Sequence, residues 1–177
     1  MTVWVLLLRG INVGGAGKLP MPALKAALDG LGCADAATYI QSGNAVFRAD
    51  RDRAGLAEAI GEAIEAGHGF RPAVFLLTAA ELEAALAANP WPEAEADAKP
   101  MHLFFHDGSA TPDTVALDAL LVPGEAWRLT PGVLYFRAPA GIGQSKFVEK
   151  LPRHFKAGMT ARNLNTCRKL AEMAAAL

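Results

Sequence analysis

The amino-acid sequence predicts an α+β fold built from two consecutive βαββαβ halves. Two observations support this prediction: the order of strand-like and helix-like segments repeats past the middle of the chain, and each half contains two strands joined by a tight turn. A composition of 52% hydrophobic and 20% charged residues is typical of a chain that buries a core. A βαββαβ unit has the ferredoxin-like plan, in which helices pack on one face of an antiparallel sheet. We therefore predict two tandem ferredoxin-like halves within one compact unit.

In the first half, the run Val3–Leu8 is apolar throughout, which is typical of a central strand buried on both faces. A glycine-rich stretch follows, and then a helix with leucines at helical spacing. Ser42-Gly43 separates two strand-like segments and predicts a hairpin. Thr78 and Glu81 have the spacing of a capping box that opens a further helix. The remaining predicted elements are strands at 38–41, 44–48 and 73–77, a helix beginning near Pro20 and Pro22, and a helix capped by Asp50 or Asp52.

The second half repeats this order of elements. Strands are predicted at 101–106, 126–130 and 133–137, helices at 112–121 (capped by Thr111) and 146–155 (with a break at Pro152), then a short extended piece near 159–162 and a last helix. We assign residues 1–89 to the first half, 90–100 to a proline-rich linker and 101–177 to the second half with its C-terminal helix. The internal duplication is inferred from element order alone, because no residue-level repeat is visible.

Positive charge is concentrated near the C-terminus. The formal net charge is -1, yet the segment Arg137–Lys169 contains eight Lys or Arg residues and a single Glu. Such a segment can attract phosphate groups, nucleic acid or an acidic protein. Alternatively, it faces the acidic middle of the same chain, Glu81–Glu125, where nine carboxylates meet one Lys. Both interpretations remain open at this stage.

The sequence also predicts a cytoplasmic protein that does not associate with membranes. Cys33 and Cys167 lie far apart and lack the spacing of a metal site, so we expect free, reduced thiols. The apolar run near the N-terminus is too short to cross a bilayer. We find no signal for an oligomeric state.

The stretch Arg9–Lys18 is the first candidate ligand site. Glycines between a strand and a helix allow backbone N–H groups to turn toward an anion, with help from the helix N-terminus. A P-loop would need Gly and Ser/Thr where this chain has Asn12 and Leu19, and the dinucleotide motif GxGxxG fails at Pro20. In a βαββαβ unit this loop and the hairpin turn leave the sheet at the same end. The candidate ligand-binding residues at this edge are Arg9, Asn12, Gly14, Gly15, Lys18, Ser42 and Asn44.

A second candidate edge combines Gly141–Lys146 with Thr160–Asn163, since both stretches leave their sheet at one end. Ser145 and Lys146 stand at a predicted helix start, and Arg162 and Asn163 end the last strand. Together these four side chains would form a clamp for phosphate or carboxylate. The alternative is a solvated surface with an ordinary helix cap.

These stretches carry three motifs: RGINVGG over residues 9–15, TYIQSGN over 38–44 and TARN over 160–163. On these motifs the sequence resembles a bacterial domain-of-unknown-function family, number 1697 in its series. The resemblance implies a fold of two ferredoxin-like halves, in agreement with the pattern of elements. It implies no reaction, because the family has no established activity to carry over.

Signals for catalysis are sparse. His102 and His106 lie on one predicted strand, so their rings are about 13 Å apart at ~3.3 Å per residue, too far to share a metal ion. We predict no metal site and no cofactor, and assign no catalytic residue. The leading hypothesis is a protein that binds an anionic, phosphorylated or carboxylated small molecule through its glycine-rich loops and basic C-terminal segment. Nucleic-acid binding, an enzyme acting on an anionic substrate, and a purely protein-binding role are the alternatives.

Overall fold

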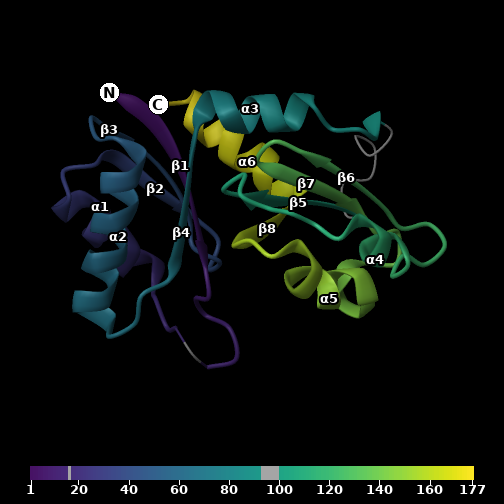
Figure 1. Ribbon diagram of the computed structural model, residues 1–177. Coiled ribbons are helices and arrows are strands. Elements are labelled where there is room, and N and C mark those ends of the chain that lie inside the picture. Colours follow the sequence, from purple (N-terminus) through teal and green to yellow (C-terminus); the bar gives the residue numbers. More distant parts are fainter. Residues whose placement is uncertain (16, 93–99) are drawn as a thin grey trace. The chain divides into compact units, whose positions relative to one another are not determined.

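The computed structural model describes residues 1–15, 17–92 and 100–177, and the chain divides into two compact units. The first unit contains Met1–Ala84 and Arg168–Leu177, and the second contains Ala85–Cys167. Most of the predicted linker, residues 93–99, lies outside the described residues. Each unit has one four-stranded antiparallel sheet with helices packed against it (Figure 1). Within the described part of the chain, no helix combines the length and apolar character needed to cross a bilayer.

The first unit has the predicted βαββαβ order. Its sheet is arranged β2-β3-β1-β4, which is the ferredoxin-like strand order, and every neighbouring pair is antiparallel. The elements are β1 (Thr2–Arg9), α1 (Met21–Gly30), β2 (Ala34–Tyr39), β3 (Asn44–Ala49), α2 (Arg53–His68), β4 (Ala73–Thr78) and α3 (Ala79–Ala87).

The core of the first unit lies between the sheet and two helices. Helices α1 and α2 cover the same face of the sheet (Figure 1), and their leucine and isoleucine side chains pack against Leu6, Leu8 and Phe47. Val5 and Leu7 point to the opposite face of the central strand and are buried as well. The prediction that this strand is buried on both faces is therefore confirmed. Since burying one such side chain contributes about 1.5–3 kcal/mol, the apolar run accounts for the central place of β1.

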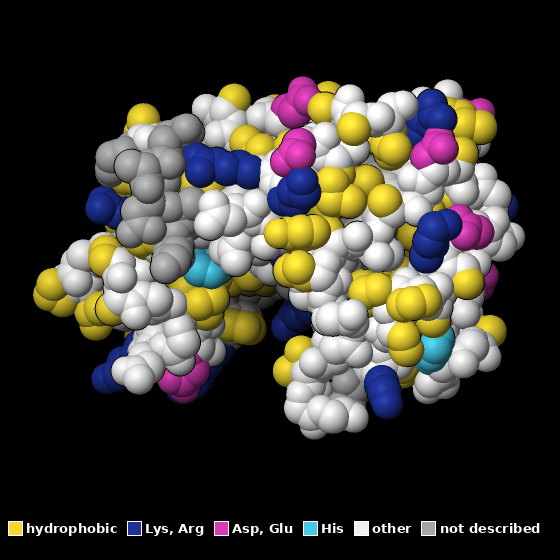
Figure 2. Space-filling view, turned by 180° about the vertical axis from the view of Figure 1, so that it is seen from behind, with side chains coloured by type: hydrophobic (Ala, Val, Ile, Leu, Met, Phe, Trp, Pro, Cys, Tyr) yellow, Lys and Arg dark blue, Asp and Glu magenta, His cyan; other side chains and the backbone are white. Residues whose placement is uncertain are grey.

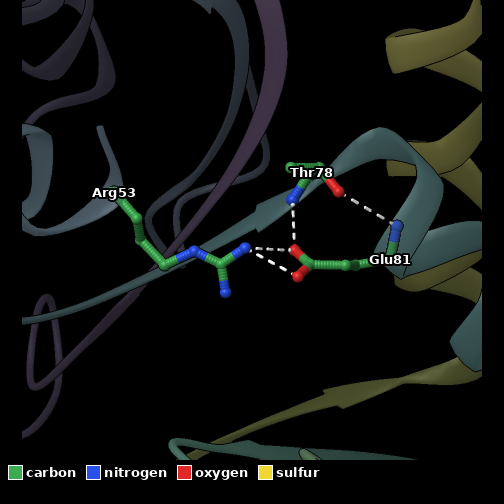
Figure 3. Close-up of polar contacts among 3 residues, drawn as sticks. All are labelled: Arg53, Thr78 and Glu81. Atoms are coloured by element: carbon green, nitrogen blue, oxygen red, sulfur yellow. Dashed lines mark hydrogen bonds and ion pairs between the residues drawn. The ribbon is translucent and has the colours of Figure 1, made fainter. Parts of the chain in front are cut away.

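Polar side chains cap helices α2 and α3 at their starts, as predicted. The carboxylate of Asp52 accepts a hydrogen bond from the Gly55 N–H at 2.9 Å, so Asp52 is the cap of α2. At α3 the Glu81 N–H donates to the Thr78 hydroxyl at 3.2 Å, and the Thr78 N–H donates to the Glu81 carboxylate at 2.8 Å. This reciprocal pair is the predicted capping box. Figure 3 shows that Arg53 also points at this carboxylate, to which it donates at 2.6 Å.

The second unit repeats the strand order of the first. Its sheet runs β6-β7-β5-β8, again antiparallel throughout, so the prediction of two similar halves is confirmed. The elements are β5 (Met101–His106), α4 (Thr114–Asp118), β6 (Ala126–Thr130), β7 (Val133–Arg137), a 3-10 turn η2 (Ile142–Gln144), α5 (Lys146–Phe155), β8 (Met159–Asn163) and the start of α6 (Leu164–Ala175). The residues of α6 from Arg168 onward belong to the first unit, and the last residues of α3, from Ala85, belong to the second.

Helices α4 and α5 cover one face of the second sheet (Figure 1). Helix α5 buries Phe147, Leu151 and Phe155, and the Phe147 ring stacks on Phe136 with 4.5 Å between the ring centroids. The predicted break at Pro152 is wrong, because α5 continues through this exposed residue to Phe155. The buried phenylalanines at both ends of α5 hold it on the sheet and offset the backbone hydrogen bond that proline removes.

Other boundaries also differ from the prediction: β2 begins at Ala34 rather than residue 38, and α4 ends at Asp118 rather than residue 121. Two further differences have a local cause. Helix α4 begins at Thr114, because the carboxylate of Asp113, rather than the Thr111 side chain, caps it by accepting the Ala116 N–H at 3.0 Å. Strand β2 ends at Tyr39 instead of residue 41, since Ile40 has a φ of 50°, which is incompatible with an extended strand. Both differences come from local geometry that the hydrophobic pattern does not encode.

Candidate ligand site at the glycine-rich loop

The glycine-rich loop, residues 10–15 and 17–20, connects β1 to α1. Its backbone reverses direction through a series of left-handed residues: Gly10, Gly14, Gly15 and Gly17 have φ between 59° and 84°, and Asn12 has φ 53°. Glycine adopts this conformation without strain, and Asn is the side chain that tolerates it best. The composition of the loop therefore follows from its backbone path.

Asn12 holds the loop together and ties it to the hairpin turn. Its side-chain amide donates to the carbonyls of Leu19 and Gln41, both at 2.9 Å, and its side-chain oxygen accepts the Leu19 N–H at 2.9 Å. The Asn12 N–H donates to the Gly17 carbonyl at 2.9 Å. The two stretches predicted to share an edge do lie together, and the predicted ligand-binding residue Asn12 uses its side chain to join them.

Two glycines are required at this edge because neighbouring atoms leave no room for a side chain. A Cβ on Gly17 would lie 2.3 Å from the Gly10 carbonyl oxygen. A Cβ on Gly43, in the hairpin turn, would lie 2.6 Å from Ile11 Cδ1 and 2.7 Å from Leu8 Cβ. By contrast, a Cβ on Gly14 or Gly15 would meet no atom of the described residues within 4 Å. The base of the loop is thus tightly packed, and its tip is open.

The hairpin turn is held by its own side chains. Asn44 is buried, and its amide donates to the Tyr39 carbonyl at 3.1 Å and to the Ser42 hydroxyl at 2.9 Å. The Gly43 carbonyl accepts the Leu8 N–H at 2.8 Å, which fastens the turn to β1. The predicted ligand-binding residues Ser42 and Asn44 therefore stabilise the turn.

The remaining predicted residues of this edge are the ones available to a ligand. Arg9 and Lys18 are exposed, and neither makes an ion pair or a side-chain hydrogen bond with any residue that the structure describes. Likewise, the N–H groups of Gly14 and Gly15 have no hydrogen-bond acceptor within the described ranges. Two cations and two backbone donors are the groups that recognise a carboxylate or phosphate.

The start of α1 adds little to this site. The cap residue Pro20 has no side-chain hydrogen bond, and Pro22 stands at the second helical position. Because proline has no N–H, the first turn lacks two of the donors that a helix N-terminus usually presents. The expected help from the helix N-terminus is therefore wrong for this loop.

The second candidate edge lies at one end of the second sheet, as predicted. Arg137 and Asn163 pair with the adjacent residues Met101 and His102 of β5, so the exits of β7 and β8 meet there. Ser145 and Asn163 are both helix caps: the Ser145 hydroxyl accepts the Val148 N–H at 3.3 Å, and the Asn163 side-chain oxygen accepts the Thr166 N–H at 2.8 Å. Of the predicted clamp, Lys146 is an exposed cation.

Arg162 is buried, which its place in a short polar motif did not indicate. Only 9% of the residue is exposed, and its guanidinium donates to the Thr160 hydroxyl at 2.8 Å and to the Ala161 carbonyl at 2.7 Å. Burial lowers the pKa of Arg162 to about 10. Its contacts make Arg162 part of the second unit's interior.

Helix α5 presents a basic face. Lys146, Lys150 and Arg153 are exposed at helical spacing on the side opposite the buried phenylalanines, and Lys150 pairs with Glu149 at 2.6 Å. On the face of the molecule shown in Figure 2, the Lys and Arg side chains are scattered, and several lie directly beside Asp or Glu side chains. Positive charge is dispersed on that face and does not form one continuous patch.

The buried titratable groups lack the surroundings of a reactive site. Burial raises the pKa of the Cys167 thiol to about 12, despite an opposing effect of Arg162, and burial also raises the pKa of Cys33. Burial lowers the pKa of both His102 and His106, which lie at opposite ends of β5. Among the described residues, no three His, Cys, Asp or Glu side chains are close enough to hold a metal ion.

Comparison with known proteins identifies the family to which this chain belongs. Residues 1–135 match the family described as "Protein of unknown function (DUF1697)", and the chain belongs to that family, so the predicted family is confirmed. Its structure is similar to that of the conserved bacterial protein SP0830 from Streptococcus pneumoniae. The two chains share 29% sequence identity over 98% of each, with a TM-score of 0.73. No curated protein matches the sequence.

Proposed function

We propose that this protein binds an anionic small molecule, phosphorylated or carboxylated, at the glycine-rich loop of its first unit. The observation that carries the proposal is the pair Arg9 and Lys18. Both cations are exposed without an ion pair among the described residues, and they flank the open N–H groups of Gly14 and Gly15 along the chain. An anion bound there would gain charge-assisted hydrogen bonds that the protein itself does not supply.

The rigidity of the loop supports the same proposal. Asn12, Gly17 and Gly43 fix the base of the loop against the hairpin turn before a ligand arrives. Ordering a flexible loop on binding would cost affinity, and a loop that is already ordered avoids much of that cost. The buried thiols of Cys33 and Cys167 are compatible with the cytoplasmic location that we propose.

A thermal-shift screen tests this function. The panel comprises inorganic phosphate, phosphate monoesters, nucleotides and dicarboxylates, each at low and moderate salt. A ligand at a hundred times its Kd stabilises its protein by about 2.7 kcal/mol, which is enough to raise the melting temperature by several degrees. We expect stabilisation that persists at moderate salt.

Paired substitutions locate the site. The double variant Arg9→Gln, Lys18→Gln should lose the stabilisation by the ligand and keep the melting temperature of the free protein, since both side chains are exposed. The control is Lys25→Gln, Arg51→Gln, which removes the same charge from exposed positions of the same unit. It also breaks the exposed Lys25–Asp29 pair at 2.8 Å, which contributes at most about 1 kcal/mol. Ligand stabilisation that is equal in both double variants would refute this site.

The basic face of α5 favours a second candidate function, nucleic-acid binding by the second unit. Lys146, Lys150 and Arg153 are spaced to contact successive phosphates of a backbone. Binding would then fall steeply with salt, because each neutralised phosphate releases counterions. Affinity for oligonucleotides that is lost in Lys150→Gln, Arg153→Gln and unchanged in Arg9→Gln, Lys18→Gln would favour this candidate over the first.

A further inference from the structure

We infer that the ligand of the glycine-rich loop is an amphiphilic phosphate monoester, whose apolar part packs on Val13 and Ile40. This inference rests on the proposed function and specifies the class of ligand. It follows from the position of exposed apolar side chains at the same edge as the two cations.

Val13 and Ile40 are unusual in the first unit. Their exposed fractions are 71% and 51%. Apart from Met1, they are the only exposed large apolar side chains in the described part of that unit. A single exposed apolar residue on a surface is ordinary. Two at one edge, in a unit whose other large apolar side chains apart from Met1 are buried or partly buried, favour a surface that a ligand covers.

The segments that carry the two side chains lie together, because a hydrogen bond joins them. Val13 follows Asn12, and Ile40 precedes Gln41; the Asn12 amide donates to the Gln41 carbonyl at 2.9 Å. Arg9, the last residue of β1, directly precedes this loop, and Lys18 lies within its second part. A ligand at this edge therefore meets both apolar carbon and positive charge.

The backbone of Ile40 points to the same conclusion. Its φ of 50° is in the left-handed region, which a β-branched side chain rarely adopts and which Asn or Gly would adopt with less strain. Ile40 therefore has two energetically unfavourable features: its backbone is strained, and its apolar side chain is exposed to water. Strained residues of this kind cluster at functional sites such as ligand clamps.

The cations and N–H groups at this edge fit a phosphate better than a carboxylate. Two cations and two N–H groups provide more donors than the two oxygens of a carboxylate require, and they match the three terminal oxygens and near-double charge of a phosphate monoester. Because the second pKa of such a phosphate is about 6, binding should strengthen as the pH rises through that value.

The test compares inorganic phosphate with 1-naphthyl phosphate by calorimetric titration of the full-length protein at pH 7.5. We expect the naphthyl ester to bind about ten-fold tighter or more, because its ring covers exposed apolar surface. Ile40→Asn suits the left-handed backbone and should fold normally, yet it should reduce that preference several-fold while leaving the affinity for inorganic phosphate unchanged. Ile40→Val is the matched control and should retain the preference.

Each outcome separates the two claims. If inorganic phosphate binds and the naphthyl ester binds no tighter, the amphiphilic ligand is refuted and anion binding stands. If the preference is undiminished in Ile40→Asn, the apolar contact lies elsewhere and the inference is also wrong. If neither compound binds, both the inference and the proposed phosphate site fail. Tight binding only to vesicles that contain phosphatidic acid would replace the small molecule by a lipid surface.

Discussion

Replacing Gly17 by Ala should disrupt the candidate site, whereas replacing Gly14 by Ala should leave it nearly intact. The two glycines form a matched pair, since their φ angles are 61° and 59° and both lie in the same loop. An alanine at either position meets the same left-handed strain, about 1–2 kcal/mol. The positions differ in what surrounds the new methyl group, so the comparison isolates packing from backbone strain.

The expected magnitude follows from the contacts. At Gly14 a Cβ has no atom of the described residues within 4 Å, so we expect a cost of the strain alone, about 1–2 kcal/mol. At Gly17 the Cβ would lie 2.3 Å from the Gly10 carbonyl oxygen, and the loop must move apart to relieve this contact. That movement breaks the hydrogen bond from the Asn12 N–H to the Gly17 carbonyl and weakens those of the Asn12 side chain, each worth about 1 kcal/mol. We expect Gly17→Ala to lose about 2 kcal/mol more than Gly14→Ala.

Urea unfolding of both variants, followed by circular dichroism, measures this difference in the free energy of unfolding. Hydrogen exchange of the β1 and α1 amides then assigns the loss to the first unit. Gly17→Ala should also lose phosphate binding, and Gly14→Ala should keep the loop geometry. Equal losses of stability in the two variants would refute the argument that the base of the loop is held by the close approach of Gly17 to Gly10.

Two further predictions concern groups away from this loop. Burial pushes the pKa of Glu81 upward, but hydrogen bonds from Arg53 and the Thr78 N–H outweigh it and hold the pKa below the ordinary 4.5. The carboxylate therefore stabilises the fold above pH 4.5 and loses this effect as the pH falls through its lowered pKa. Glu81→Gln should be less stable than wild type at pH 7, by up to about 1 kcal/mol for an exposed pair, and the gap should close in acid; a constant gap in urea titrations would contradict this. Because burial raises the pKa of Cys167 to about 12, a thiol reagent at pH 8 should label it only after unfolding, and rapid labelling of the native protein would contradict its burial.

The sequence predicts the architecture well because the fold depends on signals that are local and periodic. The apolar run at β1, the Ser42-Gly43 turn and the Thr78–Glu81 capping box each have one physical interpretation, and the structure contains all three. The boundaries were less predictable where two side chains compete for a role, as Thr111 and Asp113 do at α4.

The site was predictable in position and less so in the roles of its residues. Topology alone places the glycine-rich loop beside the hairpin turn. It does not show that the Asn12 side chain already makes three hydrogen bonds within the protein. Nor does an arginine in a polar motif indicate burial, which for Arg162 depends on the Thr160 and Ala161 contacts. The exposure of Val13 depends on the path of the glycine-rich loop, and the left-handed φ of Ile40 belongs to the hairpin turn. The nearest signal in the sequence for the φ of Ile40 is an isoleucine next to the turn-forming residues Ser42 and Gly43.

The most direct test of anion binding is a titration of the ¹⁵N-labelled protein with inorganic phosphate, followed by two-dimensional NMR. We predict saturable shifts of the Gly14 and Gly15 amide resonances, and their loss in the variant Arg9→Gln, Lys18→Gln. Saturable shifts confined to α5, or none at any concentration that saturates other phosphate-binding proteins, would contradict the glycine-rich loop as the anion site.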